Sequence, residues 1–240
     1  NLSMKKLLFT VLVIYAAILF SSCEKVVGDG PVRTETRNET NFSGIDLRVS
    51  GNVYYKVDAV YKVEITAQQN IIDVTETYVS NNKLVIKFKN DVRVRSHEDI
   101  IVMISGPQLN TIRVSGSGNI ITTGNINTSN MDLDISGSGN INMQQLTAGY
   151  LDANISGSGN ISVDNGSATE ERLKISGSGN IDLQNVLAAK ATTTTSGSGD
   201  MWLNVSKNLD ITISGSGSVR YKGNPIINTS ISGSGKVTNL

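Results

Sequence analysis

The tetrapeptide Ser-Gly-Ser-Gly occurs seven times between residues 115 and 235 of this 240-residue chain. The copies lie 21, 20, 20, 20, 18 and 18 residues apart, and they begin at Ser115, Ser136, Ser156, Ser176, Ser196, Ser214 and Ser232. A period near 20 residues is typical of a solenoid, in which each repeat forms one coil stacked on the previous coil. A coil buries its apolar face only against its neighbours, so the repeat constrains the architecture of the whole region.

The residues around each tetrapeptide alternate with the period of a β-strand. Apolar residues and both glycines share one phase, whereas the serines and the following polar residue share the other. This phase predicts one buried column of Ile141, Ile161 and Ile181, with Ser138 and Ser158 facing solvent. Inward glycines predict a sharp corner, and a flexible Gly/Ser linker would lack the flanking apolar residues. We expect an all-β, single-stranded, right-handed parallel β-helix with 18–21 residues per coil.

The first residues have the pattern of a secretory signal peptide, which we assign to residues 1–23. Two lysines precede an apolar run from Leu7 to Phe20, and two serines then lead to Cys23. The apolar run is too short to favour a transmembrane helix, which needs about 20 apolar residues. The sequence before Cys23 resembles a bacterial lipobox, although Phe20 stands where leucine is commonest. The resemblance implies cleavage before Cys23 and acylation of its thiol.

Three further segments follow the signal peptide. Residues 24–37 contain glycine, proline and mixed charges, so we expect a flexible tether that holds the folded part off the membrane. Residues 38–105 contain less regular strands, and we expect an irregular β region that caps the open end of the solenoid. Within it, residues 70–79 fit either a short helix or an extended return. Residues 106–240 form the repeat region.

Composition excludes several classes of function. Twenty-one basic and 21 acidic residues give no net charge, which argues against a nucleic-acid partner because that affinity depends on neutralising phosphates. The lone Cys23 leaves no internal disulfide, and His97 is the only histidine, so we expect no metal and no cofactor. Ser96, His97 and Asp99 are neighbours on one loop and do not suit a catalytic relay.

One outward column of the predicted coils carries the candidate ligand-binding residues. Six residues after the start of the motif stand Asp182, Trp202 and Arg220 on three successive coils, and Asp200 lies one column away. An exposed indole between an acid and a base suits stacking on a sugar ring. The alternative is an indole that a loop covers or that is merely exposed. Polysaccharide cleavage would need clustered outward carboxylates with a basic partner on this wall.

A second outward column contains the polar residue that follows each motif. These residues are Asn119, Asn140, Asn160, Asn180, Asp200, Ser218 and Lys236. They fit a ladder of side-chain hydrogen bonds along the stack, as in other stacked β structures. The other interpretation is a flat lattice for an ice or crystal surface, but such faces favour threonine.

Together these patterns resemble the putative auto-transporter adhesin, head GIN domain family of bacterial envelope proteins. The resemblance rests on three stretches: Phe42-Ser43-Gly44-Ile45, Asn81 to Ile86, and Ile112-Arg113-Val114 followed by the first tetrapeptide. It covers nearly all of residues 38–240 and implies a β-helical surface protein with an adhesin role. No catalytic residues come with the family.

The sequence therefore predicts a lipid-anchored, extracytoplasmic β-helical binding or scaffold protein at the outer membrane or cell surface. Its expected partners are the membrane, through Cys23, and a glycan or another envelope component. The alternative function is a polysaccharide-active enzyme, either a lyase or a hydrolase, although we expect a protein that is not an enzyme.

Overall fold

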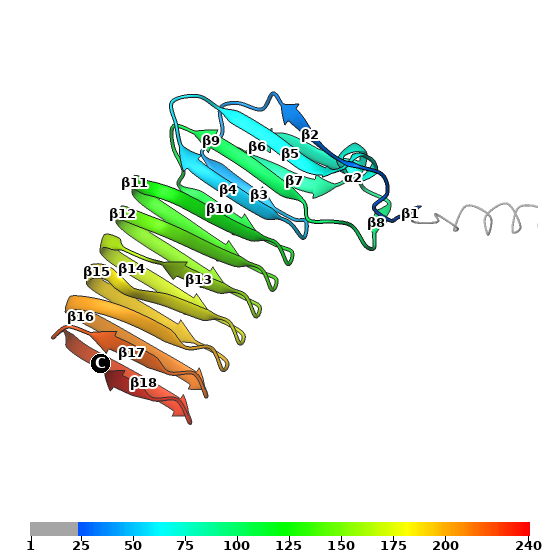
Figure 1. The fold of residues 1–240 in the computed structure, drawn as a ribbon. Coiled ribbons are helices and arrows are strands. Elements are labelled where there is room, and N and C mark those ends of the chain that lie inside the picture. Colours follow the sequence, from blue (N-terminus) through cyan, green and yellow to red (C-terminus); the bar gives the residue numbers. More distant parts are fainter. Residues whose placement is uncertain (1–23) are drawn as a thin grey trace, which may run out of the picture.

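The structure is a computed structural model that describes residues 24–240. It is all-β, with 66% strand, 3% helix and a parallel β-solenoid of about 6 turns. Figure 1 shows the solenoid as a staircase of parallel strands, with the N-terminal region at one end and the C-terminus at the other. The segment expected to be a signal peptide, residues 1–23 with Cys23, lies outside the described residues. Within residues 24–240, no helix is both long enough and apolar enough to cross a bilayer.

The repeat region forms the coils of the solenoid, and every strand pair in it is parallel. Its strands are β10 (Thr111–Val114), β11 (Asn119–Ile135), β12 (Asn140–Ile155), β13 (Asn160–Val163), β14 (Gly166–Ile175), β15 (Asn180–Thr195), β16 (Met201–Gly215), β17 (Val219–Lys222), β18 (Ile226–Gly233) and β19 (Val237–Asn239). The register follows the sequence repeat, since Ile141 pairs with Ile161 and Ile161 with Ile181. The predicted fold class, an all-β parallel β-solenoid, is confirmed.

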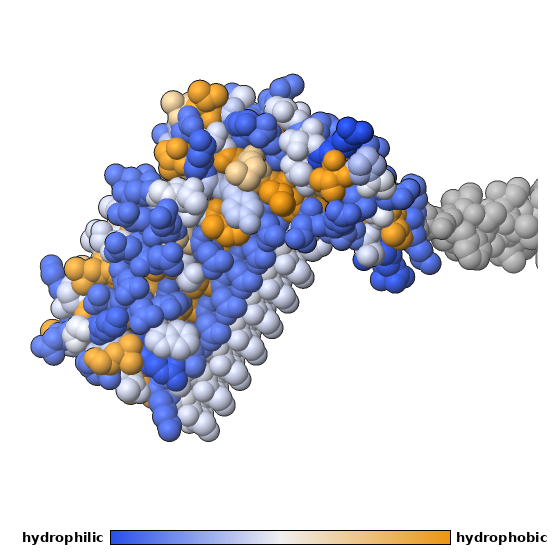
Figure 2. Space-filling view, viewed as in Figure 1, coloured by the Kyte–Doolittle hydropathy of each residue, from blue (hydrophilic) through white to orange (hydrophobic). Residues whose placement is uncertain are grey.

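The predicted inward and outward phases are also confirmed. Ile141, Ile161 and Ile181 are at most 1% exposed, whereas Ser138 and Ser158 are exposed. The tetrapeptides form bends between strands, and these corners stack on one another along the solenoid. In Figure 2 this edge is a continuous pale ridge that runs down the molecule.

The two shorter coils lose residues mainly at one turn. Asp182 pairs with Trp202, but the next paired residues are Leu187 and Asn204. The chain therefore takes five residues to pass this point in β15 and two in β16. The drop in sequence period from 20 to 18 thus shortens a turn and leaves both flanking strands in register.

The N-terminal region contains the rest of the strands and one short helix. These elements are β1 (Glu24–Val26), β2 (Val32–Arg37), β3 (Gly44–Leu47), β4 (Asn52–Val57), β5 (Lys62–Gln68), α2 (Gln69–Val74), β6 (Thr75–Ser80), β7 (Lys83–Phe88), β8 (Val92–Val94) and β9 (Ile101–Gly106). The stretch with two possible structures, residues 70–79, contains both of them, since α2 is followed directly by β6.

Strands β3 and β4 form a further coil of the solenoid. Leu47 pairs with Val114 and Asn52 with Asn119, so four residues turn the corner in both coils. Arg48-Val49 stands where the repeats have their first Ser-Gly pair. Val49 is buried at this corner, and a side chain fits there because no tetrapeptide corner stacks on its other side.

Beyond this coil the parallel stack ends in antiparallel strands. Strand β7 adds to β3 and β9 adds to β4 in parallel, and then β6 pairs antiparallel with β7 while β5 and β2 continue from β9. The helix α2 links β5 to β6 and buries Ile71 and Ile72. The region expected to be an irregular cap is therefore mostly regular sheet, and the expected boundary at residue 105 falls inside β9.

The flexible tether expected over residues 24–37 is wrong. Strand β1 pairs with β8, and β2 pairs along its whole length with β5. Between them, Asn70 Nδ2 donates to the carbonyl of Val27 at 2.7 Å, and its Oδ1 accepts from the backbone of Asp29 at 3.0 Å. The glycine and proline that suggested a linker make the turn between two paired strands.

Candidate functional site

The candidate residues lie on the wall that each coil builds directly after its tetrapeptide corner. We call this the first wall; it consists of β4, β9, β13, β17, β19 and the starts of β11, β12, β15 and β16. One outward column runs along it with one residue per coil, in the order Met103, Tyr54, Ile121, Asn142, Ser162, Asp182, Trp202, Arg220 and Thr238. We call this column the track.

Asp182, Trp202 and Arg220 occupy consecutive positions on the track, as their spacing predicts. Asp182 pairs with Trp202 in register, and Trp202 pairs with Arg220. The indole of Trp202 is partly exposed, and the guanidinium carbon of Arg220 lies 5.1 Å from the centroid of its ring. This cation–π contact holds the indole and the cation together at the surface.

Asparagine side chains form a continuous ladder beside the track. Each amide nitrogen donates to the amide oxygen one coil before it, at 2.8–2.9 Å, through Asn52, Asn119, Asn140, Asn160 and Asn180. The structure therefore supports the hydrogen-bonded ladder for these residues. Each hydrogen bond of the ladder joins the side-chain amides of two neighbouring coils.

Asp200 stands at the end of this ladder and has a structural role there. Its backbone nitrogen donates to Asn180 Oδ1 at 3.0 Å, but its carboxylate has no amide hydrogen to pass on. One carboxylate oxygen accepts from the backbone of Ser218 at 2.7 Å, and the other accepts from Arg220 Nη1 at 2.9 Å. Asp200 thus positions Arg220 through an ion pair.

Asp182 is also held by a neighbour. Its two carboxylate oxygens accept hydrogen bonds from the backbone nitrogen and the side-chain Nε2 of Gln184, both at 3.1 Å. Each carboxylate oxygen has a second lone pair, so Asp182 can still accept from a hydroxyl group. The candidate site thus offers an indole, a fixed guanidinium and a fixed carboxylate on three adjacent strands.

His97 and its neighbours do not form a catalytic group. His97 Nδ1 donates to the carbonyl of Glu98 at 2.6 Å. Its ring lies edge-on to the ring of Phe88, with 6.4 Å between the two ring centroids. In the part of the chain that the structure describes, no three His, Cys, Asp or Glu side chains are grouped to hold a metal ion.

The sequence prediction missed one exposed apolar region of the first wall. Tyr54 and Met103 are 37% and 47% exposed and line a groove of about 320 Å³ with Lys56, Lys62 and Glu64. Tyr54 lies on the same track as Trp202. The signal was present, because aligning Ser50-Gly51 with the second half of the tetrapeptide places Tyr54 six positions after the motif start.

The sequence prediction also missed a buried carboxyl group. Glu171 is completely buried inside the solenoid, in a column between Leu151 and Ala191. Neither of its carboxyl oxygens has a hydrogen-bond partner in the described structure, and burial raises its pKa to about 8. The same odd-numbered phase that identifies the buried isoleucines places Glu171 inside.

The fold is shared with solved bacterial proteins. A putative adhesin from Bacteroides fragilis is 28% identical, with a TM-score of 0.85 over 90% of this chain and 100% of the other. A putative adhesin and a putative lipid binding protein, both from Parabacteroides distasonis, are 23% and 24% identical; each has a TM-score of 0.73 over 90% of this chain and 100% of its own.

No curated protein matches the chain. The family model described as putative auto-transporter adhesin, head GIN domain matches residues 41–225, which include most of the N-terminal region and most of the solenoid. This match agrees with the resemblance carried by the strand openings and the first tetrapeptide. The chain belongs to the putative auto-transporter adhesin, head GIN domain family.

Proposed function

We propose that this protein is a lipid-anchored, adhesin-like binding protein of the cell envelope that recognises a carbohydrate through its first wall. The observation that carries the proposal is the partly exposed indole of Trp202 on the track, flanked in register by Asp182 and Arg220. Acylation of Cys23 would place it on an extracytoplasmic membrane surface, at the outer membrane or the cell surface.

The chemistry of the three side chains suits a sugar ring. The guanidinium of Arg220 lies over one face of the indole, so the proposal places the C–H face of a pyranose against the other face. An indole buries a large area there for few lost degrees of freedom. Arg220 presents donors and Asp182 presents acceptors to the hydroxyl groups at the ring edge. Arg220 is held by Asp200 at 2.9 Å, so little of its side-chain entropy remains to be lost on binding.

The arrangement favours binding over cleavage. A glycoside hydrolase places two free carboxyl groups on either side of the scissile bond. Here Asp200 forms an ion pair with Arg220, so Asp182 is the one carboxylate of the candidate site without a cationic partner in the described structure. A polysaccharide-active enzyme remains the alternative function. The same binding experiment tests it, because an enzyme would release cleavage products.

The test is retention of the protein by immobilised glycans, with the eluate analysed for cleavage products. The panel contains β-1,4-glucan, xylan, galactomannan, polygalacturonate and peptidoglycan glycan strands. We expect at least one of these glycans to retain the protein. Trp202→Ala should weaken binding to that glycan by roughly tenfold, while Trp202→Phe should keep part of the affinity.

Tyr78→Ala is the control, because Tyr78 is an exposed aromatic residue on β6, away from the first wall. Retention that is the same for Trp202→Ala and the wild type would remove Trp202 as the site. Failure of every glycan on the panel would overturn the carbohydrate proposal, and release of shortened chains would favour the enzyme.

A further inference from the structure

The groove beside Tyr54 is a second exposed surface on the same wall. Tyr54 and Met103 stand on neighbouring strands β4 and β9, and their side chains remain outside although the sheet is otherwise capped at this end. The next residue, Tyr55, points inward, is 1% exposed and donates its hydroxyl to the carbonyl of Gly106 at 2.8 Å. The floor of the groove is therefore fixed by the core.

Polar side chains surround the apolar part of the groove. Lys62 Nζ lies 2.8 Å from Glu64 Oε2, and Lys56 Nζ lies 3.3 Å from Asp58 Oδ2, so charged heads border the groove in neutral pairs. An apolar platform with a hydrogen-bonding border is the arrangement that suits a sugar ring. Paired charges give a fatty-acid carboxylate no free cation.

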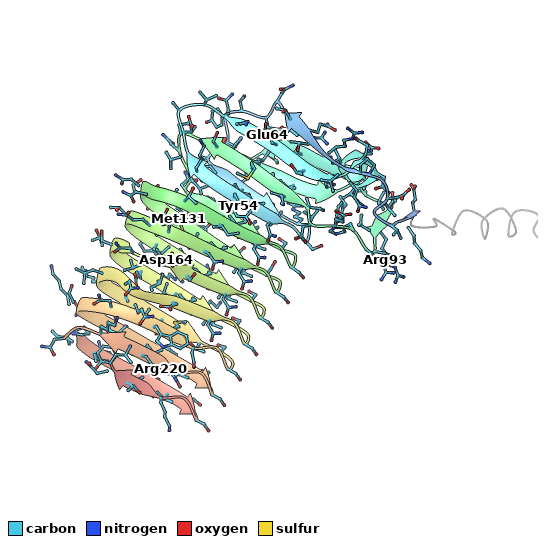
Figure 3. The ribbon with its side chains drawn as sticks, viewed as in Figure 1. Tyr54, Glu64, Arg93, Met131, Asp164 and Arg220 are labelled. Atoms are coloured by element: carbon cyan, nitrogen blue, oxygen red, sulfur yellow. The ribbon has the colours of Figure 1, made fainter. Side chains whose placement is uncertain are left out.

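The groove and Trp202 are two ends of one straight track. From Tyr54 the register passes through Ile121, Asn142, Ser162 and Asp182 to Trp202. These are five strand spacings of about 4.8 Å, which place the two aromatic residues about 24 Å apart along the solenoid. Figure 3 shows Tyr54 close to the N-terminal region and Arg220 close to the C-terminal end, both on the face turned to the viewer.

The middle of the track carries groups that bind hydroxyls. Asn142 is exposed, and its Oδ1 accepts from Ser162 Oγ at 2.8 Å, which leaves its amide hydrogens directed to other acceptors. The adjacent outward column contributes the exposed side chains of Gln144 and Asp164. Asn142, Ser162 and Asp182 therefore offer a hydrogen-bonding side chain on three successive coils of the track, whereas Ile121, on the coil next to Tyr54, is apolar.

We propose that the ligand is a linear, extended polysaccharide that lies along the solenoid axis and contacts Tyr54 and Trp202 at the same time. This inference rests on the proposed function and adds the form of the ligand and a second binding site. A pyranose in an extended polysaccharide advances the chain by about one strand spacing, so successive sugars stay in register with successive coils. A ligand of about six sugars spans the track.

The experiment follows the fluorescence of Trp202, the only tryptophan of the chain, during titration. The titrants are fragments of about two to about eight sugars, prepared from the polysaccharide of the panel that retains the protein. We expect the concentration for half-saturation to fall by roughly tenfold or more as the fragments reach about six sugars, and then to stay constant.

Tyr54→Ala separates the two ends of the track. It should raise the half-saturation concentration of long fragments roughly fivefold to tenfold, although Tyr54 lies far from the fluorescent ring. The half-saturation concentration of disaccharides should not change, because a disaccharide at Trp202 does not reach Tyr54. Tyr54→Phe should retain the tight binding, because it keeps the ring. Tyr78→Ala, at 38% exposure against 37% for Tyr54, should change neither titration.

The outcomes distinguish this inference from the proposed function. If Tyr54→Ala leaves long-fragment binding unchanged while Trp202→Ala weakens it, the ligand occupies only the Trp202 end and the spanning ligand is wrong. Equal affinity of short and long fragments has the same meaning. If laurate binds in a Tyr54-dependent way and the polysaccharide does not displace it, the groove binds acyl chains instead. If no glycan of the panel retains the protein, both proposals fail.

Discussion

At the scale of single residues, Glu171 is the least expected side chain of the solenoid. Its column holds apolar residues in the neighbouring coils, and desolvation raises its pKa from 4.5 to about 8. The carboxyl group is therefore neutral in the folded protein at pH 7, whereas it is ionised in the unfolded chain. An unpaired buried polar group costs stability even when it is neutral.

The raised pKa of Glu171 predicts a stability that falls as the pH rises. Between about pH 4.5 and pH 8 the unfolded chain releases a proton that the folded protein keeps, so ionisation favours unfolding; the loss is on the order of 4 kcal/mol. Glu171→Gln should remove this slope, and Glu171→Leu should also raise the stability at every pH. Urea unfolding at about pH 4.5, 6 and 8 measures both effects.

The matched control is Glu170→Gln on the same strand, because Glu170 is exposed. This substitution should leave the pH dependence of unfolding unchanged. If wild type and Glu171→Gln lose stability in parallel over this pH range, the buried carboxyl group does not titrate as described.

At the scale of elements, the tetrapeptide corner explains why the repeat is so strictly kept. A Cβ added to Gly159 would overlap the carbonyl oxygen of Gly139 in the coil before it and would lie 2.9 Å from Ile135 Cγ2. The same overlap recurs at Gly179 and Gly199. Glycine is needed here for the close approach of stacked backbones, and the neighbouring serines only have to face solvent.

Gly159→Ala should therefore destabilise the solenoid by about 1–3 kcal/mol, because the backbone of the preceding coil must move to admit the methyl group. Ser158→Ala, at an exposed position of the same corner, should stay within about 0.5 kcal/mol of the wild type. The urea unfolding midpoint compares the two variants. Similar midpoints would mean that the corner is looser than this packing indicates.

At the scale of the whole molecule, the proposed anchor lies at the capped end. Strand β1 begins at Glu24, directly after Cys23, and the backbone nitrogen of Glu24 donates to the carbonyl of Asp91 at 2.9 Å. An acylated Cys23 would therefore hold the N-terminal region close to the bilayer. The C-terminal end lies at the other end of the solenoid, so the track would lead from the membrane side outward (Figure 1).

The anchor predicts that Cys23→Ala moves the protein from the membrane fraction to the soluble fraction when it is expressed with its leader in a bacterium that acylates lipoproteins. Two lipid signals together bind a membrane stably. Within residues 24–240 no helix is long and apolar enough to span the bilayer in their place. Ser22→Ala is the control, since a small residue before the cysteine is kept. Detergent-dependent partitioning that persists in Cys23→Ala would contradict lipid anchoring.

Periodicity in the sequence was sufficient to predict the solenoid, its coil length and the inward and outward phases of the residues around the tetrapeptides. The reason is local: each coil repeats one pattern of inward apolar and outward polar residues, and each coil packs only on its neighbours. The same phase placed Asp182, Trp202 and Arg220 on adjacent strands, which the register confirms.

Tertiary structure was required where the chain leaves the repeat. The strands β3 and β4 stack on β10 and β11 although more than fifty residues separate them, and β2, which lies in the segment expected to be a tether, pairs with β5. This long-range pairing places Tyr54 next to Ile121 and so onto the track of Trp202. Contacts between distant segments depend on which edges remain unpaired after the local elements form, and a local pattern of residues does not record that choice.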